Sequence, residues 1–381
     1  MFCKKFDIFL DAVNNEINID RNLLKRLGRV ELTFTPLRGL KSLKYIDKYN
    51  ISNFIYGVLA FVFCIISPAY FLIKMLKAIS ARNEQMRSEI IVPKRVVLVA
   101  NGRVMHLIKR LNLGEAVGYL NTNQPNNQNI CHVYRFLGVR EYLYAYFHAI
   151  ISVFYLLWKL EDKKDILQVY VAYQWFLVYL ALSKKKDDIE TLYFANHYDR
   201  WAVMFDQVFA DKNIVLVQHG ILPENLILGY KLKNLSKVFA FNDSSVEIFK
   251  KMFDCSHTKF EKLDISLSLV EVNRERKTIL IIGQPQSMNI EIEIAKTLSN
   301  DFDVFVKPHP LYDSSEYRKL DHLIVIDDVG FYPKVDLVLC YESTLGYEYE
   351  ASDVRVVWWK GVDFNEIILQ VKSSLKVSVK S

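Results

Sequence analysis

The chain has 381 residues, of which 51% are hydrophobic and 24% charged, and its net charge is +6. This composition supports full hydrophobic cores, and the length suits two domains and an extension. The five scattered cysteines contain no CxxC pair, which argues against a disulfide framework or zinc site and for a reducing compartment. No dense basic run interleaves with stacking aromatics, so we exclude nucleic acid as a partner.

The first notable segment is the apolar stretch 54–73, FIYGVLAFVFCIISPAYFLI, which carries no charge over twenty residues. It is long enough to span a bilayer and starts too late to be a secretory signal peptide. Three interpretations are open: a transmembrane span, a hairpin or monotopic insertion broken at Ser67-Pro68, and a buried helix. Basic residues flank both sides, which favours a hairpin or shallow insertion with both ends cytoplasmic. Residues 1–50 carry ten Lys/Arg and six Asp/Glu, a charge that suits anionic lipid.

Two further apolar stretches, 142–160 and 168–182, contain scattered Tyr, His and Gln, and we interpret them as core or interface helices. The segment 121–129 is a polar loop.

From residue 94 onward, β-branched runs alternate with helical stretches, which predicts parallel sheets covered by helices. The predicted strand segments are 95–102, 191–197, 213–220, 237–243, 278–285, 303–310, 323–328, 336–344 and 354–359. They are too many for one sheet, so the fold class is α/β with two Rossmann-like domains. We expect a membrane-associated extension at 1–90, a first domain at 91–243 and a second at 244–381.

Ligands of open α/β sheets bind beyond the carboxyl ends of the strands, and four predicted strand ends are unusually polar. The first is FVKPHP, 305–310. Lys307 supplies a positive charge, His309 donates to a phosphate oxygen, and the two prolines pre-set the backbone. We expect this segment to bind a phosphate. The simpler alternative is a turn that ends the strand and leaves the histidine exposed.

The second polar end is CYESTLGYE, 340–348. Ser343 and Thr344 lie where a helix begins and provide hydroxyl and N–H groups for an anion, while Glu348 can accept from ribose hydroxyls. The alternative is a plain serine cap with a solvated glutamate. Gly283, in IIGQPQS, ends the first strand of the second domain, where such folds approach a donor.

The third and fourth polar ends belong to the first domain. In LVQHGIL, Gln218 and His219 precede a tight turn, and His219 is a candidate general base on an acceptor hydroxyl. In YFANHYDRW, a second polar cluster follows a strand and offers a base or an acceptor-binding site. Its members are Asn196, His197, Asp199 and Arg200. The alternative is that its Asp and Arg form an ion pair that only ties the loop together.

Together these motifs resemble bacterial GT-B glycosyltransferases of surface-polysaccharide assembly: capsule-type polysialyltransferases, Kdo transferases and CDP-glycerol glycerophosphotransferases. The similarity covers roughly 94–381. It implies a cleft between two domains, donor phosphates on Lys307, His309, Ser343 and Thr344, and ribose on Glu348. The polysialyltransferases have an acidic pair before the glycine where this chain has Gln218-His219, so the base is open between His219 and Asp199.

The resemblance further implies transfer from a nucleotide-activated donor, a CMP-sugar or a UDP-sugar, without metal or other cofactor. Asp327-Asp328 is the nearest acidic pair and suits a solvated strand end. The expected acceptor is a glycan or lipid-linked glycan at the cytoplasmic face of the cytoplasmic membrane. Alternatives are a glycerophosphotransferase on the same fold, a sugar-nucleotide 2-epimerase and a non-catalytic assembly factor. The oligomeric state is open.

Overall fold

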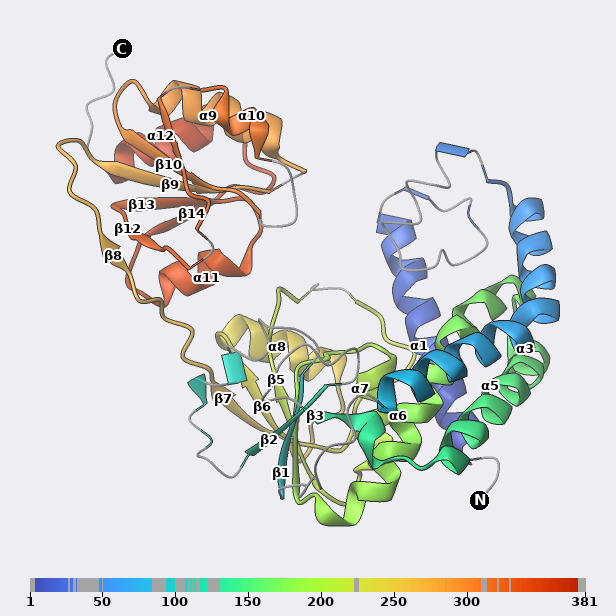
Figure 1. The fold of residues 1–381 in the computed structure, drawn as a ribbon. Coiled ribbons are helices and arrows are strands. Elements are labelled where there is room, and N and C mark those ends of the chain that lie inside the picture. Colours follow the sequence, from blue (N-terminus) through green and yellow to red (C-terminus); the bar gives the residue numbers. More distant parts are fainter. Residues whose placement is uncertain are drawn as a thin grey trace. The chain divides into compact units, whose positions relative to one another are not determined.

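The computed structural model describes residues 4–26, 28–29, 32, 48–49, 51–83, 94–99, 107–108, 110–111, 113, 117–121, 131–222, 226–284, 286–309, 314–320, 322–328 and 330–375. The chain divides into two compact units, Met1–Leu263 (unit 1) and Asp264–Ser381 (unit 2). Each unit contains its own parallel sheet and its own helices (Figure 1). The predicted α/β class with two parallel-sheet units is therefore confirmed.

The sheet of unit 1 has seven parallel strands among the described residues, in the order β3-β2-β1-β4-β5-β6-β7. The strands are β1 (Arg95–Val99), β2 (Val117–Asn121), β3 (Cys131–His132), β4 (Thr191–Phe194), β5 (Asn213–Val217), β6 (Leu235–Ala240) and β7 (Lys259–Lys262). Its central strands are continuous apolar runs because helices cover both faces of a parallel sheet. Ile214 through Val217 are all buried.

The helical elements of unit 1, except η3, contribute to one hydrophobic core with the sheet. They are α1 (Lys4–Arg26), α3 (Asn53–Asn83), η1 (Val133–Phe136), α5 (Val139–Lys159), η2 (Lys163–Val171), α6 (Ala172–Lys185), η3 (Lys186–Asp188), α7 (Arg200–Val208) and α8 (Asp243–Met252). Helix α1 packs on α7, and α3 packs on α5 and η2. The predicted extension 1–90 is thus no separate part: its described helices complete unit 1.

Helix α3 continues through Pro68, so a hairpin broken at Ser67-Pro68 does not form. A proline inside a helix lacks the N–H that would bond to the carbonyl four residues back. Here that carbonyl belongs to Cys64, and the Ser67 hydroxyl donates to it at 3.0 Å. The side chain replaces the lost bond, which lets the helix run on.

The sheet of unit 2 has five parallel strands among the described residues, in the order β11-β10-β9-β13-β14. The elements are β8 (Val270–Glu271), β9 (Thr278–Ile282), α9 (Met288–Leu298), β10 (Asp303–Lys307), α10 (Ser315–Arg318), β11 (Leu323–Val325), β12 (Pro333–Lys334), β13 (Leu337–Cys340), α11 (Thr344–Glu350), β14 (Val356–Trp358) and α12 (Phe364–Ser374). Alternate residues of β9 enter different cores: Ile279 and Ile281 join one, Leu280 and Ile282 the other. Both faces of the sheet are therefore covered.

All nine predicted strand segments contain a strand, but the domain boundary differs from the expected 243/244. Helix α8 and strand β7 follow that point and complete the first sheet, because β7 pairs with β6. The stretch 168–182 forms η2 and α6, which are largely buried, whereas α5, from 142–160, exposes one face. Most of the polar loop 121–129 lies outside the described residues.

Candidate functional site

Three strands of unit 2 end at the same level of the sheet. Ile282, the last residue of β9, pairs with Lys307 of β10 on one side and with Cys340 of β13 on the other. The strand order changes direction between β9 and β13, and such a switch point is where open α/β sheets bind ligands. Gly283, His309 and Ser343 therefore leave the sheet at one edge, around its switch point.

Gly283 is packed directly against the turn that carries His309. Its N–H donates to the Lys307 carbonyl at 2.9 Å. A Cβ at this position would lie 3.0 Å from Tyr317 Oη and 3.1 Å from Pro308 Cα. Only glycine lets the two loops approach this closely.

Lys307 is more deeply engaged than its sequence context predicts. Its ammonium donates to the carbonyls of Asp328 (2.7 Å) and Phe331 (2.9 Å) and lies over the Tyr332 ring. Burial lowers the pKa of Lys307. The side chain holds the loop after β11, and one of its three N–H donors is left for another partner.

The other donor-side residues differ in exposure. His309 is half-buried two residues beyond β10. Ser343 caps α11, its hydroxyl accepting from the Leu345 N–H at 3.3 Å. Thr344 and Glu348 are both buried within α11. His309 and Ser343 are thus the members of this set with side chains that solvent can reach.

Sequence analysis missed Glu291, which organises the loop after β9. The side chain is fully buried, and burial raises the pKa of its carboxyl. It accepts from the Gln284 N–H (3.0 Å), the Ser287 hydroxyl (2.7 Å) and the Tyr317 hydroxyl. One sequence feature could have identified Glu291: its helical spacing places it on the apolar face of α9, together with Ile294 and Leu298.

In unit 1, the ends of the neighbouring strands β4 and β5 bring His197 and His219 together. Their ring centroids lie 4.4 Å apart, and His197 Nε2 accepts the His219 backbone N–H at 3.1 Å. Burial and the nearby His219 lower the pKa of His197 well below its usual value. His197 is therefore neutral and holds the turn, whereas the His219 ring is half-buried.

Gln218 braces the same turn and is buried. Its amide nitrogen donates to the Gly220 carbonyl (3.0 Å) and the Ser245 hydroxyl (3.1 Å), and its oxygen accepts from the Phe241 N–H (2.8 Å). These bonds tie the loop after β5 to the start of α8.

Asp199 and Arg200 begin α7 and have different roles. Asp199 caps the helix, accepting from the N–H groups of Trp201 and Ala202, and also from the Asn196 amide at 2.6 Å. Burial and the Glu16 charge raise the pKa of Asp199 to about 6.

Arg200 is 5% exposed, and its guanidinium forms an ion pair with Glu16 of α1. It also donates to the Gln168 carbonyl of η2 at 3.1 Å. Arg200 thus binds α1, a helix to which the sequence analysis assigned no functional role.

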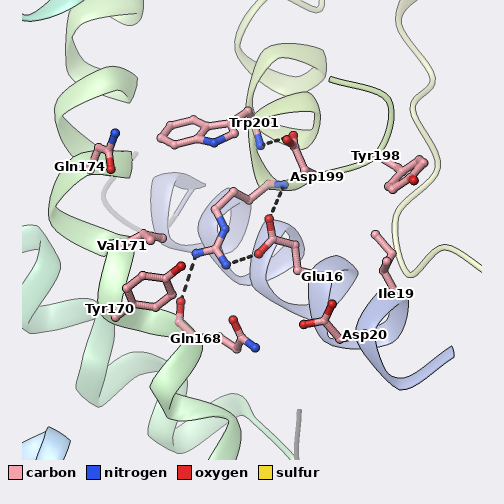
Figure 2. Close-up of a pocket in the computed structure, with 11 residues that line it drawn as sticks. Glu16, Ile19, Asp20, Gln168, Tyr170, Val171, Gln174, Tyr198, Asp199 and Trp201 are labelled. Carbon is pink, nitrogen blue, oxygen red and sulfur yellow. Dashed lines mark hydrogen bonds and ion pairs between the residues drawn. The ribbon is translucent and has the colours of Figure 1, made fainter. Parts of the chain in front are cut away.

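A cavity of about 290 Å³ lies beside this ion pair. The Arg200 guanidinium contacts both Glu16 and the Gln168 carbonyl, and Figure 2 shows Glu16 and Asp20 on the same helix, α1. The lining combines carboxylates, amides and aromatic rings, namely Glu16, Ile19, Asp20, Gln168, Tyr170, Val171, Gln174, Tyr198, Asp199, Arg200 and Trp201. Aromatic faces and amide groups suit a hydroxyl-bearing ligand.

Asp20 is the second residue that sequence analysis missed. Burial, with the charge of Glu16, raises the pKa of Asp20 to about 7, although the Arg200 charge opposes this. A carboxyl with such a pKa exchanges a proton near neutral pH, which general acid–base chemistry requires. Among the described residues, no group of three or more His, Cys, Asp or Glu is placed to hold a metal ion.

Comparison with known proteins finds distant structural likeness only. No protein-family model matches the chain, and no curated protein matches it. The similar solved structures include Anabaena HepE with UDP-glucose (11% identity, TM-score 0.42, covering 72% of this chain and 82% of that one) and with UDP and glucose (12%, 0.42, 72% and 83%). Likeness at this level assigns neither ligand nor reaction.

Proposed function

We propose that this chain is a metal-independent glycosyltransferase of bacterial surface-polysaccharide assembly, which moves a sugar from a nucleotide-activated donor to a glycan or lipid-linked acceptor. The observation that supports this most is the common edge of β9, β10 and β13, from which Gly283, His309 and Ser343 leave the sheet. This edge is the switch point of a doubly covered parallel sheet, where nucleotides bind in such folds.

In the proposed reaction, an acceptor oxygen attacks the anomeric carbon while the bond from that carbon to the donor phosphate oxygen breaks. The departing nucleotide phosphate takes up the electron pair, and His309 and Ser343, whose side chains solvent can reach, stabilise its charge. Lys307 adds positive charge and holds its loop. Thr344 and Glu348 are buried, so we assign them no direct contact with the donor.

The acceptor proton passes to a base in unit 1. His219 is favoured because both carboxylate oxygens of Asp199 already accept hydrogen bonds from Asn196 and from α7. We assign the acceptor to unit 1, with the cavity beside Arg200 as the pocket for its terminal sugar. Asn196, His197 and Gln218 then position the loops of unit 1.

We also place the enzyme at the cytoplasmic face of the membrane, where lipid-linked acceptors would meet it at high effective concentration. The support is the apolar stretch 54–73 within α3, whose free face carries Phe54, Phe61 and Ile65.

The test is a screen of CMP- and UDP-activated sugars and CDP-glycerol against the purified chain, with release of the free nucleotide as the readout. We expect release from a nucleotide-sugar, and His309→Ala to lower turnover by about 10²–10³-fold, the loss of one transition-state donor. His322→Ala is the matched control, because His322 is an exposed histidine of the same unit.

Each other outcome decides against the proposal. Release of CMP from CDP-glycerol alone would identify a glycerophosphotransferase. No turnover of any donor, together with no thermal stabilisation by CMP or UDP, would identify a non-catalytic assembly factor. Normal turnover of a folded His309→Ala variant would show that His309 does not contact the donor phosphate.

A further inference from the structure

Helix α5 is apolar on two opposite faces. One face is buried in unit 1 and is mostly apolar; its members are Tyr142, Ala145, His148, Ala149, Ser152, Val153 and Leu156. The other face is exposed yet carries large apolar side chains at helical spacing, namely Leu143, Phe147, Ile151, Phe154 and Trp158. Trp158 is 74% exposed. A helix that meets water on its outer side carries polar residues there, so this face is suited to an apolar environment.

Helix α3 shows the same two-sided pattern and packs on α5 (Figure 1). Its buried stripe runs along nearly the whole helix and consists of Tyr56, Ala60, Phe63, Ser67, Phe71 and Met75. Its outer side exposes Phe54 (79%), Phe61, Ile65, Ile73 and Leu76. The sequence carries no charge from Asn53 to Ile73.

Charged residues mark the ends of this surface. Exposed cations stand at both ends of α5 (Arg140, Lys159) and near the end of α3 (Lys74, Lys77). The only acid of α5 is Glu141, and its carboxylate is bonded to Lys184 and the Gly138 N–H. Cations bordering an apolar face complement anionic lipid headgroups. Lys159 lies over the exposed Trp158 ring, at 4.2 Å from its centroid, and tryptophan favours the membrane interface.

We propose that the free faces of α3 and α5 form one lipid-binding surface, which lies in the plane of an anionic membrane leaflet. One side of α3 is packed on η2 and α5, so only its opposite side can meet lipid. The helix therefore does not cross the bilayer, although it is long and apolar enough to do so. A second apolar stretch of this kind, Lys163–Asp188, is mostly buried in the core of unit 1.

This inference extends the proposed membrane location by a second helix and an orientation, and it does not depend on the proposed reaction. The first test is flotation of the full-length chain with phosphatidylcholine vesicles that contain or lack phosphatidylglycerol. We expect flotation with the anionic vesicles and at least a 10-fold lower bound fraction for the α5 double variant Phe147→Glu/Phe154→Glu. Leu369→Glu, at an exposed leucine on α12 of unit 2, is the matched control and should float like the wild type.

A second measurement locates α5 in the lipid. Brominated acyl chains should quench the fluorescence of the wild type, and Trp158→Phe should remove that quenching while flotation persists. Quenching that stays unchanged in Trp158→Phe would overturn the assignment of α5 to the surface.

Orientation is tested with cysteines introduced at the two ends of α3, Ser52→Cys and Ser80→Cys, both exposed positions. With protein added to sealed vesicles, an impermeant maleimide should label both positions without detergent. Protection of one end until detergent is added would show a span.

Three further results would also overturn the proposal. They are failure of the wild type to float, flotation of the double variant at the wild-type level, and a lipid-free dimer that the double variant abolishes. Release of nucleotide with a soluble acceptor is measured in parallel, so that loss of membrane binding and loss of activity remain distinguishable.

Discussion

The close approach of Gly283 to the turn after β10 makes Gly283→Ala a sharp test of the donor-side geometry. The new methyl group would lie 3.0 Å from Tyr317 Oη, 3.1 Å from Pro308 Cα and 3.4 Å from the Lys307 carbonyl oxygen. Ordinary van der Waals contact begins near 3.5 Å. Pro308 Cα is a backbone atom directly after Lys307, which is held by its pairing with β9, so a side-chain rotation cannot relieve that contact.

Overpacking of this kind costs about 1–3 kcal/mol. Since 1.4 kcal/mol is a factor of ten in an equilibrium constant, the opening of unit 2 should become about 5- to 150-fold more frequent. Gly330→Ala is the matched control in the same unit, because its methyl group would meet only Asp328 Oδ1, at 3.5 Å. It should leave the opening equilibrium within a few-fold of the wild type.

Cys340 provides the assay, because it is the only cysteine after residue 264 and is fully buried. Its thiol reacts only when unit 2 opens, so the labelling rate, read by peptide mass spectrometry, reports that equilibrium. Donor turnover is measured on the same samples under folded conditions and should fall as the His309 turn is displaced. Labelling of Gly283→Ala at the rate of Gly330→Ala would refute the packing argument.

The remaining predictions concern unit 1 and are checked by urea denaturation with peptide-resolved hydrogen exchange of β4. Glu16→Gln leaves the buried Arg200 guanidinium without its carboxylate and should cost about 3–5 kcal/mol. The exposed pair of Lys94 and Glu190 is the comparison: Glu190→Gln should cost far less stability than Glu16→Gln, because water screens an exposed pair. Equal losses would contradict the burial argument. Asp20 has a pKa of about 7 in the folded chain and 3.8 as its ordinary value, so the folded state binds a proton that the unfolded state has lost. The free energy of unfolding should therefore fall as pH rises from about 4 to 7. Asp20→Asn should make this pH dependence weaker. An unchanged pH dependence would show that another group causes it.

The strands and their order of appearance were readable from the sequence, because a β-branched run bounded by a turn is a local signal. VFVKPHP and LVLCYEST each show an apolar run followed by polar residues, and the structure ends β10 and β13 at those points. The sheet register then brings the two ends level with β9, as expected for parallel strands that share one edge.

Hydrogen-bond partners of the candidate residues were not readable. Lys307 was expected to reach a ligand, but its ammonium binds two carbonyls beyond the next strand. Arg200 was expected near Asp199, but its ion pair is with Glu16, 184 positions earlier. Glu291 carries no motif, yet three donors converge on its carboxylate.

The sequence by itself determined the α/β class, the apolar stretch at 54–73 and the polar strand ends, since periodicity and turn chemistry involve residues close along the chain. The tertiary structure alone decided that α1 closes the cavity beside Arg200, that α3 packs on α5 and η2, and that α5 presents a second apolar face outward. These outcomes depend on which distant surfaces pack together. Burial, ion pairing and exposure are properties of that packing, and no local window of sequence contains them.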